Sequence, residues 1–199
     1  VVGGVHQGRP HLLGHLFARR ERRGGEELGQ SGGGSVIDTA KATAHGTANP
    51  EADIWDIWMG KVKLEKSLPV GVVLTIPAAG SEGNCGSVIT NEDGNYKLGY
   101  SHPSLFPVFS ILNPETTFTL PPYQTAAGAV DTIAHTLGAY ITDDTESYLV
   151  QNIGESVIRT VVKYAPIALE NPTDYNARAQ LMWAATTAAN STISNGCRH

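Results

Sequence analysis

The sequence predicts an α/β part followed by an all-helical part, with the boundary near residue 119. Residues 71–77, GVVLTIP, form a continuous β-branched apolar run, which is typical of a strand in a parallel sheet that is covered on both faces. Three glycines and a serine at 32–35 lead directly into an apolar pattern of helical period. From Leu120 onward strand patterns stop, and two prolines introduce helical sequence. A run of strands followed by a run of helices indicates two segregated parts.

The composition describes an ordinary globular protein. The chain has 199 residues, 41% of them hydrophobic, and a formal net charge of −5. The acidic balance gives no reason to expect nucleic acid or an anionic membrane as a partner. No apolar run is long enough to span a bilayer, and no signal-peptide pattern opens the sequence, so we expect a cytoplasmic protein. Cys85 and Cys197 form no metal-ligand spacing and are interpreted as free thiols.

Residues 1–30 cannot be assigned to any element, and we interpret them as disordered or aberrant. They mix Gly, Arg and His without a sustained period of 2 or 3.6. Four arginines between positions 19 and 23 favour a solvated segment over a nucleic-acid patch, because aromatic residues are not interleaved with them. Residues 24–31 have almost no apolar side chains, so the sequence predicts no buried strand before the glycine-rich turn.

The glycine-rich turn is predicted to open a helix that ends at Gly46. Ser35 and Asp38 have the spacing of a capping box, in which a Ser or Thr is followed three residues later by an acid. Glycines allow backbone N–H groups to approach an anion closely, and the positive end of the helix dipole favours a phosphate there. A tight turn with no ligand is an equally good interpretation of this short pattern. The apolar positions of the helix are Val36, Ile37, Ala40 and Ala44.

The remaining elements follow from local patterns. The predicted strand at 71–77 breaks into the small residues 78–81, which leave room for a ligand at the carboxyl edge of a sheet. Residues 87–91 and 96–101 are predicted to pair as a hairpin around an Asp-Gly turn. Further elements are a short helix at 54–58, a buried strand within 107–114, and helices at 123–140, 145–169 and 173–192.

The segment GAVDTIAHTLGAY, residues 128–140, contains an acid and an imidazole in an otherwise apolar helical pattern. Asp131 and His135 are four residues apart, so their side chains leave the same helix face. Such a pair can interact with itself or can bind one metal ion. The spacing alone favours a surface pair without a ligand, because polar pairs of this kind are common on helices.

Four segments in this order resemble the iron-containing (group III) alcohol dehydrogenases, especially the branch of butanol dehydrogenases and NADPH-dependent aldehyde reductases. They are GGGSVIDTAK, TIPAAGSEGN, YKLGYSHPSLFPVFSILNPETTFTLPP and AGAVDTIAHTLGAYIT. The resemblance covers about residues 32–196. It implies a Rossmann-like cofactor-binding part at 31–119 and an all-helical metal-binding domain that begins at 120–199, the dehydroquinate synthase-like architecture of this family.

The resemblance also implies roles for individual residues. Its glycine loop holds the cofactor pyrophosphate, its second segment lies along the nicotinamide, and a lysine after the hairpin turn reaches the cofactor. The matching residues are Gly33, Gly34, Ser35 and Asp38, then Thr75, Gly80, Ser81 and Asn84, and finally Lys97. Asp131 and His135 match the first two of the four metal ligands of the family. The resemblance therefore also implies that they belong to the catalytic site. The implied cofactors are NADP or NAD with Fe²⁺ or Zn²⁺, the implied substrates are alcohols and aldehydes, and the family allows a homodimer.

The two ends of the chain depart from the family pattern. The third and fourth ligands of the family are histidines beyond the segment TISNG, and His199 does not match either position. Because catalytic metal sites usually use at least three protein ligands, we expect the metal site to be incomplete. We also expect the chain to be truncated at both ends. Two alternatives stay open. One is a non-catalytic α/β remnant that at most binds nucleotide, and the other is chemistry like that of glycerol dehydrogenase or dehydroquinate synthase.

Overall fold

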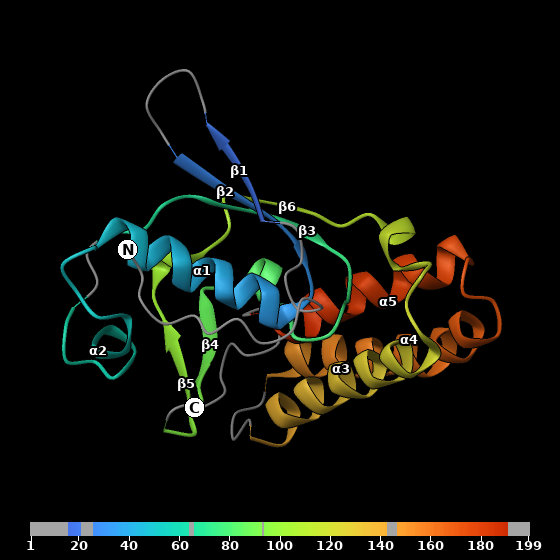
Figure 1. The fold of residues 1–199 in the computed structure, drawn as a ribbon. Coiled ribbons are helices and arrows are strands. Elements are labelled where there is room, and N and C mark those ends of the chain that lie inside the picture. The colour runs from blue at the N-terminus through green and yellow to red at the C-terminus, as the bar shows by residue number, and fades with distance from the viewer. Residues whose placement is uncertain (1–15, 21–25, 64–65, 93, 143–146, 191–199) are drawn as a thin grey trace.

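The computed structural model describes residues 16–20, 26–63, 66–92, 94–142 and 147–190. A strand-rich part comes first in the chain and three long helices follow, so the predicted order of an α/β part and a helical part is confirmed (Figure 1). Of the residues predicted to have no element, two segments within 16–32 form strands. The strands are β1 (Leu16–Arg20), β2 (Glu26–Gly32), β3 (Val70–Leu74), β4 (Gly86–Asn91), β5 (Tyr96–Ser101) and β6 (Phe109–Ile111). The helices are α1 (Gly34–Ala48), α2 (Ile54–Trp58), α3 (Pro122–Thr142), α4 (Tyr148–Glu170) and α5 (Tyr175–Ala188), with short 3-10 turns η1 (Ser81–Gly83), η2 (Pro103–Leu105) and η3 (Pro114–Thr117).

The main sheet has the strand order β1-β2-β3-β6. Strand β2 runs parallel to β3, from the pair Leu28 and Val70 to the pair Gly32 and Leu74, and β1 is antiparallel to β2. A strand therefore precedes the glycine-rich turn, in a segment to which the sequence assigned no element. Its apolar pattern is weak, but its backbone groups pair with β1 on one side and β3 on the other, and sequence periodicity does not report such pairing.

Helix α1 covers the sheet with the face that its apolar period predicts. It ends two residues beyond Gly46, where we expected its last turn. The cluster between helix and sheet also includes one residue of α5, which draws the two parts of the chain together. Its fully buried members are Ile37, Ala40, Ala44, Val70, Val72, Leu74 and Met182.

The hairpin of β4 and β5 is confirmed, and α2 packs on it. The two strands are antiparallel from the pair Gly86 and Ser101 onward, and the hairpin extends below α1 (Figure 1). The indole N–H of Trp58 in α2 donates to the carbonyl oxygen of Ser87 at 3.2 Å. In the turn, Asn95 has a φ of 53°, while the predicted turn residue Asp93 lies outside the described residues.

Strand β6 corrects the prediction of a buried strand within 107–114. Only three residues are extended, and the side chains of Phe109 and Ile111 are half exposed. Because β6 follows β3 at one end of the strand order, only one of its edges pairs within the described sheet. The ring of Phe109 lies over Gly71 of β3, where an added Cβ would come within 2.3 Å of it.

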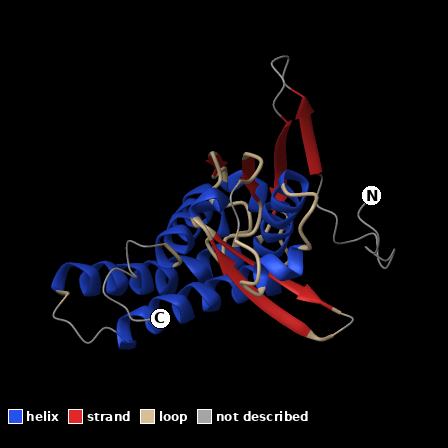
Figure 2. Cartoon of the chain, turned by 90° about the vertical axis from the view of Figure 1, so that its left-hand side faces the viewer, coloured by secondary structure: helices blue, strands red, loops and turns tan. Residues whose placement is uncertain are grey.

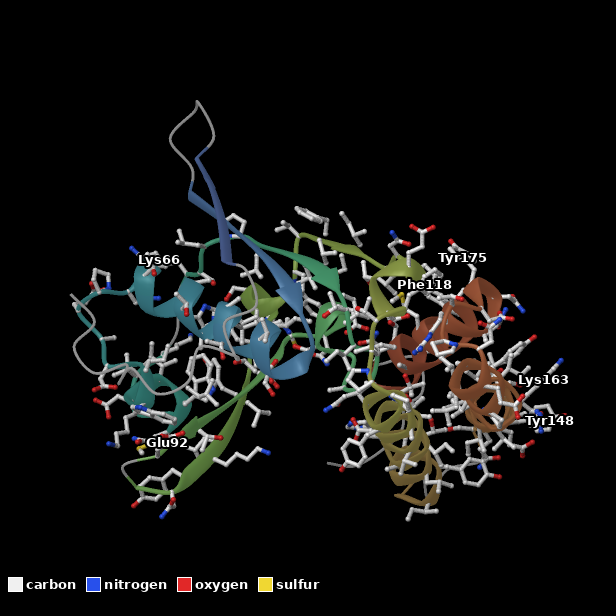
Figure 3. The ribbon with its side chains drawn as sticks, turned by 45° about the vertical axis from the view of Figure 1, so that its right-hand side comes forward. Lys66, Glu92, Phe118, Tyr148, Lys163 and Tyr175 are labelled. Atoms are coloured by element: carbon white, nitrogen blue, oxygen red, sulfur yellow. The ribbon has the colours of Figure 1, made fainter. Side chains whose placement is uncertain are left out.

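The three helices of the second part confirm the predicted elements and differ from the predicted bounds by a few residues at most ends. Their shared core is formed largely by small and β-branched side chains, including Val157, Val161 and Ala177, together with Leu181. Tyr148, Lys163 and Tyr175 lie on the outer side of this part (Figure 3). None of the helices in the described ranges is both long and apolar enough to cross a membrane. The view turned by 90° shows the helices beside the strand-rich part (Figure 2).

Candidate functional site

The glycine-rich turn joins the end of β2 to the first residue of α1. Gly33 is the N-cap of α1 and makes no side-chain cap hydrogen bond. A Cβ at Gly33 would lie 3.2 Å from Ile76, and one at Gly34 would lie 3.2 Å from Ala79, so larger residues at these positions would press on the loop that follows β3. The N–H of Thr75 donates to the carbonyl oxygen of Gly32 at 3.2 Å. The glycine turn and the loop after β3 are therefore in direct contact, as expected for two segments of one site.

The predicted capping box of α1 is wrong. Ser35 lies inside the helix and is exposed, so it does not cap the first turn. The carboxylate of Asp38 binds other elements instead of the start of α1. It accepts a hydrogen bond from Ser81 Oγ at 2.6 Å and one from the N–H of Val88 at 3.0 Å. Burial raises the pKa of this carboxyl group, and the hydrogen bonds from Ser81 and Val88 oppose the rise. Asp38 thus connects α1 to η1 and to β4.

The loop after β3 contains four of the predicted cofactor residues. Thr75 is partly buried, and Gly80 has a φ of 62°, a left-handed conformation that favours glycine. Ser81 is buried within the network that includes Asp38. Asn84 folds its side-chain oxygen back to accept from the N–H of Gly86 at 2.9 Å. The structure brings these residues to one loop, while Lys97 is exposed on β5 of the hairpin.

Sequence reasoning missed Lys41, a residue of α1 whose side-chain nitrogen binds this loop. Its side chain is fully buried, and its Nζ donates to backbone carbonyl groups of the loop at 2.7–2.8 Å. Burial lowers the pKa of Lys41 to about 8, against the opposing influence of Asp38. One signal was available: Lys41 follows Ile37 by four residues and Ala40 by one, so it belongs to the apolar face of α1, where an uncompensated cation would be costly.

Asp131 and His135 lie together on α3. Nε2 of His135 is 3.8 Å from Oδ2 of Asp131, and the side chains of both are 46% exposed. A carboxylate and an imidazole one helical turn apart suit Fe²⁺ or Zn²⁺, since neither metal requires thiolate. Within the described ranges, no group of three or more His, Cys, Asp and Glu side chains is placed to hold a metal ion. The pair therefore fits half of a metal site.

Helix α3 approaches the loop after β3 through a glycine. At Gly128, an added Cβ would lie 2.6 Å from the carbonyl oxygen of Pro77. Gly128 precedes Asp131 by three residues, which is about one helical turn. The predicted metal pair is thus carried by a helix that touches the loop of the predicted cofactor residues.

A part-buried hydrogen bond from α5 to η1 also joins the two parts of the chain. Glu82 of η1 is only 3% exposed, and its carboxylate accepts from Thr186 Oγ1 of α5 at 2.5 Å. The carbonyl oxygen of Glu82 accepts from Ser110 Oγ of β6, also at 2.5 Å. An added Cβ at Gly80 would lie 2.3 Å from Cβ of Ala189, so the loop and the end of α5 fit closely. The loop after β3 therefore contacts both the sheet and the helical part.

Comparison with known proteins identifies related sequences. The family model described as iron-containing alcohol dehydrogenase matches residues 31–114, and that of the C-terminal region of the Fe-containing alcohol dehydrogenase family matches residues 125–199. NADH-dependent butanol dehydrogenase B of Clostridium acetobutylicum is 44% identical over 165 residues, which are 83% of this chain and 42% of that protein. The NADPH-dependent aldehyde reductase YqhD of Escherichia coli is 40% identical over 167 residues, which are 83% of this chain and 43% of the relative.

Solved structures show the same arrangement of elements. The crystal structure of NADH-dependent butanol dehydrogenase A from Thermotoga maritima superposes with a TM-score of 0.81 at 47% identity, over 85% of this chain and 42% of that chain. The crystal structure of YqhD from Escherichia coli superposes with a TM-score of 0.82 at 39% identity, over 86% of this chain and 44% of that chain. The chain thus spans about two fifths of the length of the relatives that it matches.

Proposed function

Because the chain belongs to the iron-containing alcohol dehydrogenase family, we propose that the protein transfers hydride between a nicotinamide cofactor and a primary alcohol or aldehyde with the help of a divalent metal. Relatives named as butanol dehydrogenases and as an aldehyde reductase support this substrate class. The observation that carries the proposal is the junction of three predicted segments: the glycine turn contacts the loop after β3, and that loop contacts α3 beside Asp131.

The glycine turn is the proposed pyrophosphate site. The first N–H groups of a helix have no partner within the helix, and the helix dipole adds a partial positive charge there. Gly33 and Gly34 have no side chain that would keep an anion away from these groups. Ser35 stands exposed in the same first turn, where its hydroxyl group can donate to a phosphate oxygen.

The loop after β3 is the proposed nicotinamide side. Thr75 contacts the glycine turn through its N–H, and Gly80 contacts the end of α5. Ser81 and Asn84 hold the loop in shape through hydrogen bonds with Asp38 and Gly86. Lys97 on the hairpin is also proposed to reach the cofactor. NADH and NADPH are both retained as candidates, since the names of the relatives include each of them.

Asp131 and His135 are the proposed metal ligands of this chain. When bound, a nicotinamide supplies or accepts the hydride, and Fe²⁺ or Zn²⁺ polarises the substrate oxygen. The Asp131 carboxylate offers negative charge and His135 offers a neutral imidazole nitrogen, and their position on one helix face directs both donors to the same point. The other ligands of a complete site have to come from residues outside this pair.

Nucleotide binding by the 199-residue chain tests the first half of the proposal. NADH and NADPH are titrated against the purified chain by nucleotide fluorescence. We expect at least one of them to bind and Gly33→Val to weaken that binding, since the new side chain would press on Ile76. Gly138→Ala is the matched control, because its added Cβ meets no atom within 4 Å. Absence of binding by the unaltered chain would contradict the proposal.

Metal-dependent turnover tests the second half. Oxidation of NADPH and NADH is followed at 340 nm with butyraldehyde and added Fe²⁺ or Zn²⁺. Activity that a chelator abolishes would support the metal role of Asp131 and His135. Nucleotide binding without any turnover would favour the alternative of a non-catalytic nucleotide-binding chain, an alternative supported by the presence of only two clustered donors in the described ranges.

A further inference from the structure

The side chain of Lys41 extends from α1 and donates hydrogen bonds to the loop after β3. Its side chain is 0% exposed. Its Nζ donates to three backbone carbonyl groups, those of Ser81 at 2.7 Å and of Asn84 and Gly86 at 2.8 Å each. A protonated amine has three N–H donors, so these three acceptors use its full capacity. The ammonium group therefore binds the second half of the loop, from Ser81 to Asn84, and the first residue of β4.

The same turn of α1 holds the loop at further points. Ser81 Oγ lies 3.0 Å from Nζ of Lys41 and donates to Asp38 Oδ1 at 2.6 Å. The other carboxylate oxygen of Asp38 accepts from the N–H of Val88 at 3.0 Å, and Val88 of β4 pairs with Gly99 of β5. Asp38 and Lys41 are three residues apart and share one helix face. Both charges of this turn are thus directed into the loop and the hairpin.

We propose that Lys41 is a positioning residue of the cofactor site, and that it sets the place of the loop after β3 relative to the glycine turn. This inference rests on the proposed function, because the loop matters for catalysis only if a nicotinamide lies against it. Helix α1 begins at Gly34 and carries Lys41 two turns later, so it acts as a rigid spacer between the anion-binding turn and the anchored loop. Lys41 does not need to touch the cofactor to have this effect.

The groups around the Lys41 ammonium explain why an apolar residue at this position would not hold the loop. Burial in the protein disfavours the charged form and lowers the pKa of Lys41 to about 8, while the negative charge of Asp38, and less strongly Cys85 and Glu82, act against that decrease. Removal of the ammonium group would leave three inward-pointing carbonyl groups without a donor. The loop would then have to turn these groups toward water, away from α1.

The test compares Lys41→Met with Lys61→Met by hydrogen exchange and by nucleotide titration. Lys61 is an exposed lysine that pairs with Asp56, so its loss controls for the removal of one positive charge. The amides of Gly83 and Gly86, which donate to Gly80 O and Asn84 Oδ1, report on the loop. We expect Lys41→Met to speed their exchange and weaken nucleotide binding, each at least about tenfold, because orphaned carbonyl groups favour the open loop. Exchange in α4 should stay unchanged.

Two further outcomes keep the inference separate from the proposed function. Unchanged exchange of the loop amides in a folded Lys41→Met chain would overturn the role of Lys41 even if the unaltered chain binds NADH. Failure of the unaltered chain to bind either nucleotide would contradict the proposed function, and the exchange comparison would still decide whether Lys41 anchors the loop.

If Lys41→Met does not fold, as judged by circular dichroism, the unaltered chain provides the test. Lysine labelled with ¹⁵N should give one slowly exchanging ammonium signal, coupled through hydrogen bonds to the carbonyl carbons of Ser81, Asn84 and Gly86. Rapid exchange of the Lys41 ammonium protons at pH 6 would overturn the inference.

Discussion

Acid should destabilise this protein through His45, a buried imidazole of α1. The residue is 0% exposed, and the ring meets Trp58 edge-on at 5.8 Å between centroids. Among the residues that the structure describes, neither ring nitrogen has a hydrogen-bond partner. Burial lowers the pKa of His45 from 6.5 to about 4, and the positive charge of His102 contributes in the same direction. The folded protein therefore keeps the imidazole neutral at a pH at which the unfolded chain binds a proton.

The sign and size of the effect follow from proton linkage. Stability rises with pH wherever the unfolded state binds more protons, so the contribution of His45 is fully present above pH 6.5 and is lost as the pH falls toward 4. At about 1.36 kcal/mol per pKa unit, the lowering corresponds to roughly 3 kcal/mol. Since ordinary domains are stable by only about 5–15 kcal/mol, a loss of this size is readily measured.

The assay is urea unfolding between pH 8 and pH 4.5 for the unaltered chain and for His45→Phe. Phenylalanine has a similar shape and no titrating group, so any packing cost should shift its whole stability curve without adding a pH dependence. His135→Gln, which removes a half-exposed imidazole, is the control. Parallel curves for the unaltered chain and His45→Phe between pH 6.5 and pH 4.5 would refute the reasoning.

Three further outcomes are expected. Thr186→Val should cost about 1–3 kcal/mol of unfolding free energy, because the buried carboxylate of Glu82 loses its donor, while Thr187→Val on the exposed side of α5 should cost less in the same urea titration. Gly128→Ala should lower the melting temperature, because a Cβ placed 2.6 Å from a loop carbonyl oxygen outweighs the gain of about 1 kcal/mol in helix propensity; an unchanged or higher value would show that α3 can shift freely. In a protein of the full family length, His135→Ala should abolish butyraldehyde reduction and leave NADH affinity nearly intact, and an equal loss of both would count against the metal assignment.

Patterns within short stretches of sequence predicted the main helices, the hairpin and one strand of the sheet. The helical periods after the glycine turn and after residue 120 and the hairpin all appear in the structure. The β-branched strand predicted at 71–77 appears as β3 at 70–74, and its last three predicted residues belong to the following loop. A motif series in a fixed order predicted the family, which the comparisons confirm. The cofactor and metal roles assigned to individual residues stay predictions, although the structure brings the glycine turn, the loop after β3 and α3 into contact.

Other features were missed because their cause lies far away in the sequence. Strand β2 has few apolar residues and exists through pairing with β1 and β3. Strand β6 has an apolar sequence, yet Phe109 and Ile111, which project from the same face of the strand, are half exposed. Periodicity reports whether a segment can bury one face, and it does not report which partner covers that face.

The sequence by itself determined the order of the α/β part and the helical part, the family and the position of the glycine turn, because helix period, β-branched runs and glycine conformations are properties of neighbouring residues. Only the tertiary structure decided what Asp38, Lys41 and His45 do, although all three belong to one predicted helix. Asp38 does not form the expected cap and instead accepts hydrogen bonds from η1 and β4. Lys41 donates to carbonyl groups that lie 40 to 45 positions away in the sequence, and His45 is held neutral in the core. The free energy of a buried charge or imidazole depends on the groups that surround it, and the folded chain brings those groups from remote segments.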